Sequence, residues 1–193
     1  RVVFQGTDGA YSQAAMHKFF SKDVNSFHVQ TFRDAMEAIE EGSADFAVLP
    51  IENSSAGMVS EMYDLLEEFE NYIVGEVILP INHYLVGTEN TTLESIERVY
   101  SHPQALMQCS KFLDRHGNWQ QIGAANTAVA AKKILNENDP TQAAICSEHA
   151  AEIYGLKILE EKINHNHNNS TRFIVVTNQK IFLKKAQKIS ICF

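Results

Sequence analysis

The sequence predicts an α/β protein built as a two-lobed clamp. Short β-rich runs alternate with amphipathic helical segments from one end to the other, which is typical of a domain with a largely parallel sheet. The run at 46–49 is continuously apolar, as expected of a strand covered on both faces. Two crossings of the chain, near residues 80 and 165, separate the lobes. They predict an interlobe ligand cleft beyond the carboxyl ends of the strands.

The first lobe is predicted to comprise residues 1–79 and 165–183. Its expected strands lie at 2–4, 27–30, 46–49 and 172–176, and its expected helices at 12–20, 32–41 and 58–69. Ser12 is a candidate N-cap, and Thr31 with Asp34 has the spacing of a capping box. Gly42 closes the second helix. Residues 50–57 are expected to form a loop.

The second lobe is predicted to span residues 80–164. The run at 73–86 is β-rich, interrupted at Pro80 and longer than one strand needs, so we expect it to cross between the lobes. Further strands are expected at 98–101, 121–124, 142–146 and 157–160, and helices at 103–116, at about 127–137 and between Ser147 and Gly155. Pro103 suits the first position of its helix, and Asn126 or Thr127 caps the next.

Composition excludes several classes of function. Lys plus Arg is 16 and Asp plus Glu is 24, so the net charge is 16 − 24 = −8, which argues against binding to nucleic acid or to an anionic membrane. Apolar residues make up 45% and charged residues 21%, as in ordinary globular domains. Cys109, Cys146 and Cys192 are widely spaced and odd in number, which indicates reduced thiols and a cytoplasmic protein.

Two loops after predicted strands carry groups that could bind a ligand. The Gly-Thr-Asp-Gly-Ala-Tyr-Ser turn at 6–12 opens a helix and could hold an anion on its backbone N–H groups, although a plain turn explains it better. The Pro-Ile-Glu-Asn-Ser-Ser segment at 50–55 gathers more polar side chains than one helix cap needs. Redundant capping and a binding role explain that segment equally well.

Two further segments contain residues suited to catalysis or carboxylate binding. In Ser-His-Pro-Gln at 101–104, Gln104 is expected to share a helix face with Gln108. The neighbouring Cys109 is better explained as a buried apolar residue than as a nucleophile paired with His102. Asn-Ser-Thr-Arg-Phe at 169–173 offers a hydroxyl donor and a guanidinium shaped for a carboxylate, or is simply the start of an exposed strand.

A metal site is not expected. The histidines at 165 and 167 are two possible ligands, and zinc needs three or four ligands with a supporting shell.

Taken together, these motifs resemble those of the prephenate dehydratase family, in its order and at its spacing, over nearly the whole chain. They are Gly-Ala-Tyr-Ser, Pro-Ile-Glu-Asn-Ser, Ser-His-Pro-Gln followed by Gln-Cys, and Asn-Ser-Thr-Arg-Phe. More narrowly, the chain resembles the dehydratase part of a bifunctional bacterial chorismate mutase–prephenate dehydratase. The resemblance implies a two-lobed clamp like that of type II periplasmic binding proteins, and conversion of prephenate to phenylpyruvate with loss of carbon dioxide and water, without metal or organic cofactor.

The resemblance also implies roles for particular residues. It places the essential hydroxyl at Thr171. Candidate substrate contacts are Asn53, Ser54, Ser101, His102, Gln104, Gln108, Arg172 and Phe173. Glu52 is a second candidate proton donor if burial raises its pKa.

Partners and alternatives follow from the same resemblance. We expect a homo-oligomer, a chorismate mutase domain fused in the full-length chain, and a regulatory ACT domain of which 184–193 would be the linker and first strand. Arogenate dehydratase, the same reaction on the amino-bearing substrate, is the nearest alternative. A non-catalytic small-molecule-binding clamp is the alternative from another class, and the hydroxyl of Thr171 favours the enzyme.

Overall fold

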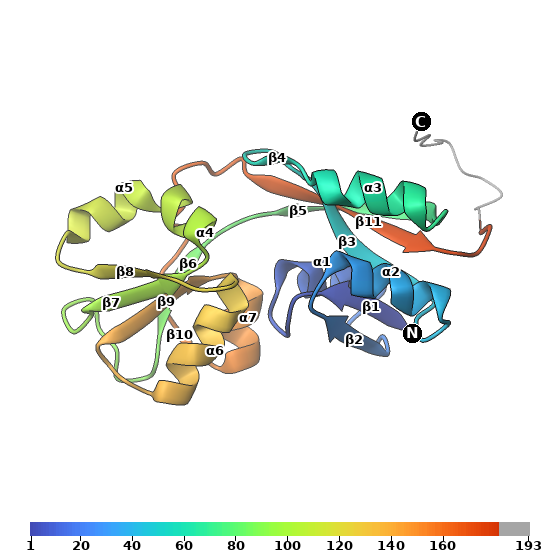
Figure 1. Ribbon diagram of the computed structural model, residues 1–193. Helices are drawn as coiled ribbons and strands as arrows, with labels where there is room; N and C mark the ends of the chain where they lie inside the picture. The colour runs from blue at the N-terminus through green and yellow to red at the C-terminus, as the bar shows by residue number, and fades with distance from the viewer. Residues whose placement is uncertain (182–193) are drawn as a thin grey trace. The chain divides into compact units, whose positions relative to one another are not determined.

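The computed structural model describes residues 1–181 and is a mixed α/β chain with two sheets, as predicted (Figure 1). The chain forms two compact units. Within the described residues, the first unit consists of Arg1–Gly6, Ala15–Leu79 and residues 170–181, and the second of Thr7–Ala14 and Pro80–Asn169. The segment Thr7–Ala14, which was expected in the first lobe, groups with the second unit. The predicted linker and ACT strand at 184–193 lie outside the described residues.

The sheet of the first unit contains six strands: five follow the order β2-β1-β3-β11-β5, and the short β4 pairs with β3. Their bounds are β1 Val2–Gln5, β2 Ser26–Val29, β3 Phe46–Asn53, β4 Gly57–Met58, β5 Tyr72–Pro80 and β11 Ser170–Thr177. β1 is parallel to β2 and β3, whereas β11 is antiparallel to β3. The sheet is therefore mixed. The chain enters β11 directly from the second unit, with no helix among the described residues between β10 and β11.

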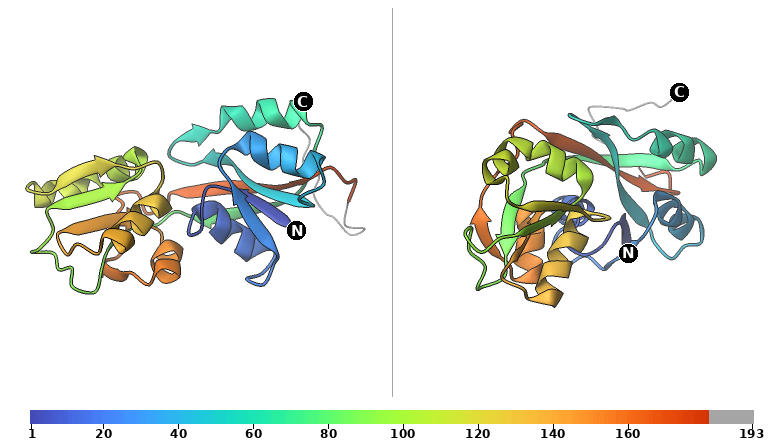
Figure 2. Two further views of the ribbon diagram at one scale, coloured as in Figure 1. Left: turned by 60° about the horizontal axis from the view of Figure 1, so that its bottom comes forward. Right: turned by 60° about the vertical axis from the view of Figure 1, so that its left-hand side comes forward.

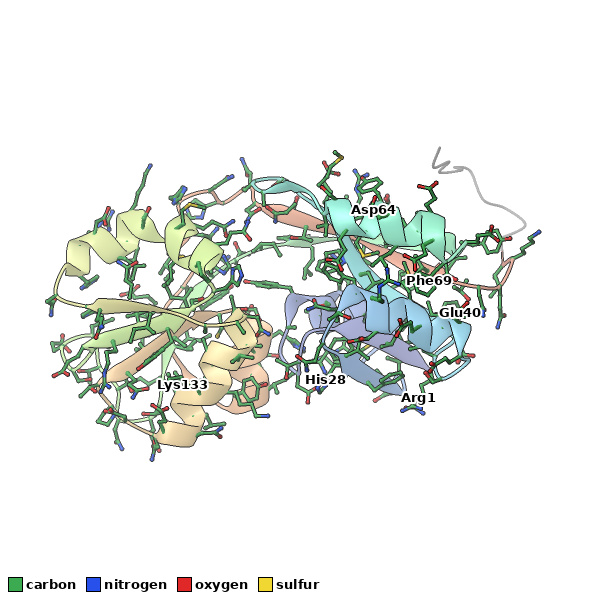
Figure 3. The ribbon with its side chains drawn as sticks, in the orientation of Figure 1. Arg1, His28, Glu40, Asp64, Phe69 and Lys133 are labelled. Carbon is green, nitrogen blue, oxygen red and sulfur yellow. The ribbon has the colours of Figure 1, made fainter. Side chains whose placement is uncertain are left out.

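Three helices belong to the first unit wholly or in part: α1 Tyr11–Phe19, α2 Phe32–Glu40 and α3 Ser60–Glu68. The strands and α2 and α3 share one apolar cluster, to which they contribute Val3, Met36, Ile39, Ala47, Leu49, Met62, Leu65, Ile174 and Val176. Phe69 at the end of α3 packs against this cluster (Figure 3). On the opposite face Phe20, just after α1, contacts Phe46 with ring centroids 5.4 Å apart. The sheet is covered on both faces, as the apolar run at 46–49 predicts.

Two boundaries in the first unit differ from the prediction. β3 continues through Pro50 to Asn53, so half of the expected loop at 50–57 is strand. Pro50 has no N–H to donate, and it lies opposite Phe173 next to a β-bulge, where a ladder tolerates proline. α1 begins at Tyr11, so Ser12 lies in its first turn and is not the N-cap.

The sheet of the second unit has the order β10-β6-β9-β7-β8. The bounds are β6 Tyr84–Gly87, β7 Arg98–Ser101, β8 Gln120–Gly123, β9 Gln142–Cys146 and β10 Lys157–Glu160. β7 is parallel to β8 and β9, while β6 is antiparallel to β9 and β10 is antiparallel to β6. The β-rich run at 73–86 is thus two strands, β5 in one sheet and β6 in the other, as expected of a crossing segment.

Helices cover both faces of this second sheet (Figures 1 and 2). The elements are α4 Pro103–Gln108, α5 Ser110–Leu113, a 3₁₀ turn Asp114–His116, α6 Thr127–Glu137 and α7 Glu148–Tyr154. One face packs against α6 and α7, and the other against α4 and α5. On α6, the ammonium of Lys133 lies 4.8 Å from the centroid of the Tyr100 ring (Figure 3).

The helix predicted at 103–116 is broken in two at Cys109. This residue has φ −105° and ψ 8°, outside the helical region, and it ends α4 and precedes α5. At this break Cys109 is fully buried, in the same apolar cluster as Leu106 of α4 and Leu113 of α5. In the described part of the chain, no helix is long and apolar enough to cross a bilayer.

Candidate functional site

Thr171 lies near the start of β11, directly opposite Asn53 at the end of β3. The Nδ2 atom of Asn53 donates a hydrogen bond to Oγ1 of Thr171 over 2.8 Å. The oxygen and nitrogen of this amide cannot exchange places, because its oxygen accepts hydrogen bonds from the backbone N–H groups of Ser55 and Ala56, each at 2.9 Å. The hydroxyl of Thr171 therefore receives one hydrogen and keeps its own, for which no acceptor is found among residues 1–181.

This arrangement suits a hydrogen-bond or proton donor. Thr171 is 9% exposed, so water competes weakly for its hydroxyl. A hydroxyl whose oxygen already accepts a hydrogen bond is polarised and donates more strongly, and a low local dielectric increases the effect. Sequence reasoning named Thr171 and Asn53 separately, and the structure joins them in one hydrogen-bonded pair.

Ser54 has a structural role beside this pair. Its backbone N–H donates to the carbonyl of Ser170 over 2.9 Å, and its hydroxyl accepts from the Ser170 N–H, also over 2.9 Å. These bonds extend the β3–β11 ladder past Thr171. They hold the two strand ends in register, which fixes the distance between Asn53 and Thr171.

Arg172 points to the opposite face of the sheet from Thr171, since successive strand residues alternate. Its Nε atom lies 3.9 Å from a carboxylate oxygen of Glu52 and 3.9 Å from one of Glu76. Its side chain is 48% exposed, and that of Glu52 is 47% exposed. The burial that a proton-donor role for Glu52 requires is therefore not found, and Arg172 is engaged by acidic side chains.

Phe173 follows the bulge and is buried. It lies opposite Pro50 in the register of β11 and β3. Its position is that of a core residue supporting the end of β3.

In the second unit, Ser101 ends β7 and is fully buried. Its hydroxyl donates to the carbonyl of Ile145 over 2.6 Å, which ties β7 to β9. His102 is the N-cap of α4, and its Nδ1 atom accepts from the backbone N–H of Gln104 over 3.2 Å. Ser101 and His102 thus set where α4 starts and, with it, where Gln104 and Gln108 lie.

Gln108 belongs to a chain of polar side chains that sequence reasoning missed. One end of its carboxamide lies 2.8 Å from Nε2 of His83, and Nδ1 of His83 lies 3.0 Å from the hydroxyl of Tyr11. The Tyr11 hydroxyl also donates to the carbonyl of Asn82 over 2.6 Å. One hydrogen-bonded chain therefore joins α1, the start of β6 and the end of α4 within the second unit.

Backbone contacts hold this chain in place. The N–H of His83 donates to the side-chain oxygen of Asn164 over 2.9 Å, and the N–H of His165 donates to the carbonyl of Gln108 over 3.0 Å. Burial lowers the pKa of His83 below its usual 6.5. Burial also raises the pKa of Tyr11 well above 10.0. Both rings are therefore uncharged near neutral pH.

The signal for His83 in the sequence is weak. A lone histidine inside Ile-Asn-His-Tyr-Leu at 81–85 has no spacing that marks it as functional. Tyr11 was part of the Gly-Ala-Tyr-Ser motif, but nothing in the sequence connects it to a residue about seventy positions away. Their contact depends on the long-range fold.

The structure thus assembles two groups of the predicted site residues. Asn53, Ser54, Thr171, Arg172 and Phe173 come together in the first unit, and Ser101, His102, Gln104 and Gln108 in the second. A single cleft lined by both groups stays a prediction. Cys109 is buried, and burial raises the pKa of its thiol to about 12, which does not suit a nucleophile. No cluster of three or more metal-ligating side chains occurs within the described residues.

The fold and these polar groups define a two-unit α/β protein whose hydrogen-bonding side chains gather at strand ends and helix starts, the usual place for small-molecule sites in such sheets. A family model for prephenate dehydratase matches residues 2–181. The chain belongs to the prephenate dehydratase family.

Named relatives agree with this assignment. A bifunctional chorismate mutase/prephenate dehydratase from Enterobacter agglomerans is 40% identical over 184 residues, which cover 94% of this chain and 48% of the relative. An arogenate dehydratase/prephenate dehydratase from Arabidopsis thaliana is 41% identical over 181 residues, covering 94% of this chain and 47% of the relative. The chain thus spans about half the length of these curated relatives.

A solved structure is similar over the same range. The crystal structure of a prephenate dehydratase from Arthrobacter aurescens in complex with L-Phe has a TM-score of 0.88 and 31% identity to this chain. The similarity covers 96% of this chain and 62% of that one.

Proposed function

We propose that this chain converts prephenate to phenylpyruvate, with Thr171 as the donor to the departing ring hydroxyl. The C–C bond to the ring carboxylate breaks and releases carbon dioxide. Its electron pair enters the ring, and the C–O bond to the ring hydroxyl breaks. That oxygen takes up the proton of the Thr171 hydroxyl and leaves as water, and Thr171 regains a proton from solvent. Formation of the aromatic ring supplies the driving force.

The protein's task in this reaction is to orient a dianion and to donate one hydrogen at the right atom. The observation that carries the proposal is the hydrogen bond from Asn53 to Thr171, which leaves the hydroxyl hydrogen of Thr171 available. Threonine is a weak acid in water, so its donation is effective where burial and a polarising partner assist it. Thr171 has both.

The test is an assay of the purified chain with prephenate as the sole substrate. We expect phenylpyruvate to form well above the rate in the same buffer without protein. Parallel preparations of Thr171→Ala control for contaminating activity. A wild-type preparation that forms no more product than Thr171→Ala would overturn the assignment.

Arogenate is the second candidate substrate, and the 41% identity to the plant arogenate/prephenate enzyme favours testing it. It differs from prephenate by an amino group in place of the side-chain ketone, and its product would be phenylalanine. Comparing kcat/KM for the two substrates decides between them. We expect prephenate to be preferred.

We also propose the wider setting of the enzyme. The bifunctional relatives support a fused chorismate mutase domain in the full-length protein. A regulatory ACT domain and a homo-oligomeric state remain proposals from the family resemblance. The buried free thiols of Cys109 and Cys146 support a reducing, cytoplasmic location.

A further inference from the structure

The hydrogen bonds around His83 determine which of its nitrogens carries a proton. The hydroxyl of Tyr11 has one hydrogen and two neighbours, the carbonyl oxygen of Asn82 at 2.6 Å and Nδ1 of His83 at 3.0 Å. A carbonyl oxygen can only accept, so the hydrogen lies on the shorter contact. The phenol oxygen is then the acceptor toward His83. Nδ1 must therefore carry a hydrogen to donate to it.

The opposite assignment leaves an unfavourable contact. If Nδ1 were bare, the Tyr11 hydrogen would turn toward the ring. The phenol oxygen and the Asn82 carbonyl oxygen would then face each other at 2.6 Å with no hydrogen between them. His83 is 3% exposed, so water could not relieve this contact.

The protonation of Nδ1 determines whether Gln108 must donate or accept the hydrogen bond at Nε2. A neutral imidazole with a hydrogen on Nδ1 has a lone pair on Nε2, and that lone pair needs a donor. The two ends of a carboxamide have nearly the same shape, and the hydrogen-bond network decides which end faces which partner. The end of Gln108 that lies 2.8 Å from Nε2 is therefore the NH₂ group. The carbonyl oxygen of the carboxamide is turned away from the histidine.

We propose that His83 is a positioning residue that holds the NH₂ group of Gln108 and so presents its carbonyl oxygen as a hydrogen-bond acceptor for the substrate. This inference rests on the proposed function, in which Gln108 contacts substrate. Ionised prephenate has two carboxylates and a ketone, which only accept, and one hydroxyl, which can donate. An acceptor at Gln108 therefore selects the ring hydroxyl. Gln108 thereby orients the group that leaves as water.

The first experiment reads the tautomer of His83 without any substrate. Long-range ¹H–¹⁵N correlation spectra of the histidine-labelled chain at neutral pH distinguish a proton on Nδ1 from one on Nε2. The His83 signal is assigned by through-bond correlation to its own backbone. We expect a proton on Nδ1 and none on Nε2, and a proton on Nε2 in the wild-type chain would overturn the inference.

The Tyr11→Phe variant provides the matched test. It removes the phenol oxygen that accepts from Nδ1, so we expect the proton to move to Nε2 and Gln108 to turn its oxygen toward the ring. Tyr154→Phe is the control, because the Tyr154 hydroxyl also donates to a backbone carbonyl of the second unit, that of Asp8, over 2.6 Å. It should leave the His83 signal unchanged. A tautomer that stays the same in Tyr11→Phe contradicts the proposal.

The second experiment connects the tautomer to turnover. We expect kcat/KM for prephenate to fall about tenfold in Tyr11→Phe, the scale of one misdirected neutral hydrogen bond, and to stay unchanged in the Tyr154→Phe control. An altered tautomer with unchanged kcat/KM would overturn the role of Gln108 while leaving the proposed function intact. Absence of turnover in the wild type would instead refute the proposed function, and the spectra would still decide the tautomer.

Discussion

Thr171 receives a hydrogen bond from Asn53 and retains a hydrogen for donation, so its hydroxyl is the atom on which the proposed chemistry depends. Replacing Thr171 with Ala should lower kcat by at least about 10²-fold, the usual scale for a lost general acid. Thr171→Ser keeps the hydroxyl and should retain part of the activity. Steady-state kinetics with circular dichroism to confirm folding is the measurement. A near wild-type rate in the Ala variant would show that another group is the donor.

The direction of the same hydrogen bond can be tested at Asn53. Asn53→Asp keeps the shape of the side chain and an oxygen for the N–H groups of Ser55 and Ala56. A carboxylate cannot donate, so the Thr171 hydrogen would turn toward Asp and be lost to the substrate. We expect a loss of kcat similar to that of Thr171→Ala, with little change in thermal stability. Substantial activity in this variant would mean that the amide does not set the direction of donation.

His83 should make stability depend on pH. Its folded pKa lies below the usual 6.5, so between these two values the unfolded chain binds more protons than the folded one. The free energy of unfolding should therefore fall as the pH drops below about 6.5, and stop falling below the folded pKa. Urea unfolding across this range measures it, with His83→Asn as the comparison. The variant should lose part of the slope, and parallel curves for the two proteins would contradict the prediction.

At the scale of elements, local signals could be predicted and long-range pairings could not. The capping box of Thr31 with Asp34 and the end of a helix at Gly155 are confirmed, because each depends on residues within one turn. The extension of β3 past Pro50 was missed, since it requires β11, whose Thr171 lies 118 positions from Asn53. The contact of His83 with Tyr11 was missed for the same reason.

The capping box of α2 provides a test at this scale. The Thr31 hydroxyl accepts from the Asp34 N–H, and the Asp34 carboxylate accepts from the Thr31 N–H, each over 3.0 Å. Thr31→Ala should lower the free energy of unfolding by about 1 kcal/mol. Thr127→Ala is the control, since Asn126 already caps α6, and should stay within about 0.5 kcal/mol of wild type. Equal effects in the two variants would argue against a capping contribution.

At the scale of the whole molecule, each unit is built from stretches of chain that are separated in sequence. The first unit brings Ala15–Leu79 together with β11, after the whole of Pro80–Asn169 has intervened. β11 lies between β3 and β5 in its sheet, so this sheet cannot be completed before the rest of the chain has been ordered. Most pairings of the second sheet join strands much closer in sequence. Closing a longer loop costs more entropy and slows folding.

The second unit should accordingly refold before the sheet of the first unit is complete, and the fluorescence of one residue reports the folding of the second unit. Trp119 is the single tryptophan, and it is buried in the second unit. After dilution from denaturant, its fluorescence should reach the native value before the amides of Val175 and Val48 in the first sheet become protected from hydrogen exchange. Pulse labelling beside stopped-flow fluorescence measures both. Simultaneous changes would show that the two units fold as one.

The hydrogen bond from the Ser54 N–H to the Ser170 carbonyl also affects the slow chemical degradation of the protein. Asparagine followed by serine is prone to deamidate when the next backbone nitrogen attacks the side-chain carbonyl carbon. At Asn53 that nitrogen belongs to Ser54, and its N–H is held by the carbonyl of Ser170 over 2.9 Å. The attack requires this bond to break and the strand end to rotate. Strand pairing therefore protects Asn53 from the slow chemical conversion to aspartate that would reverse the direction of its hydrogen bond.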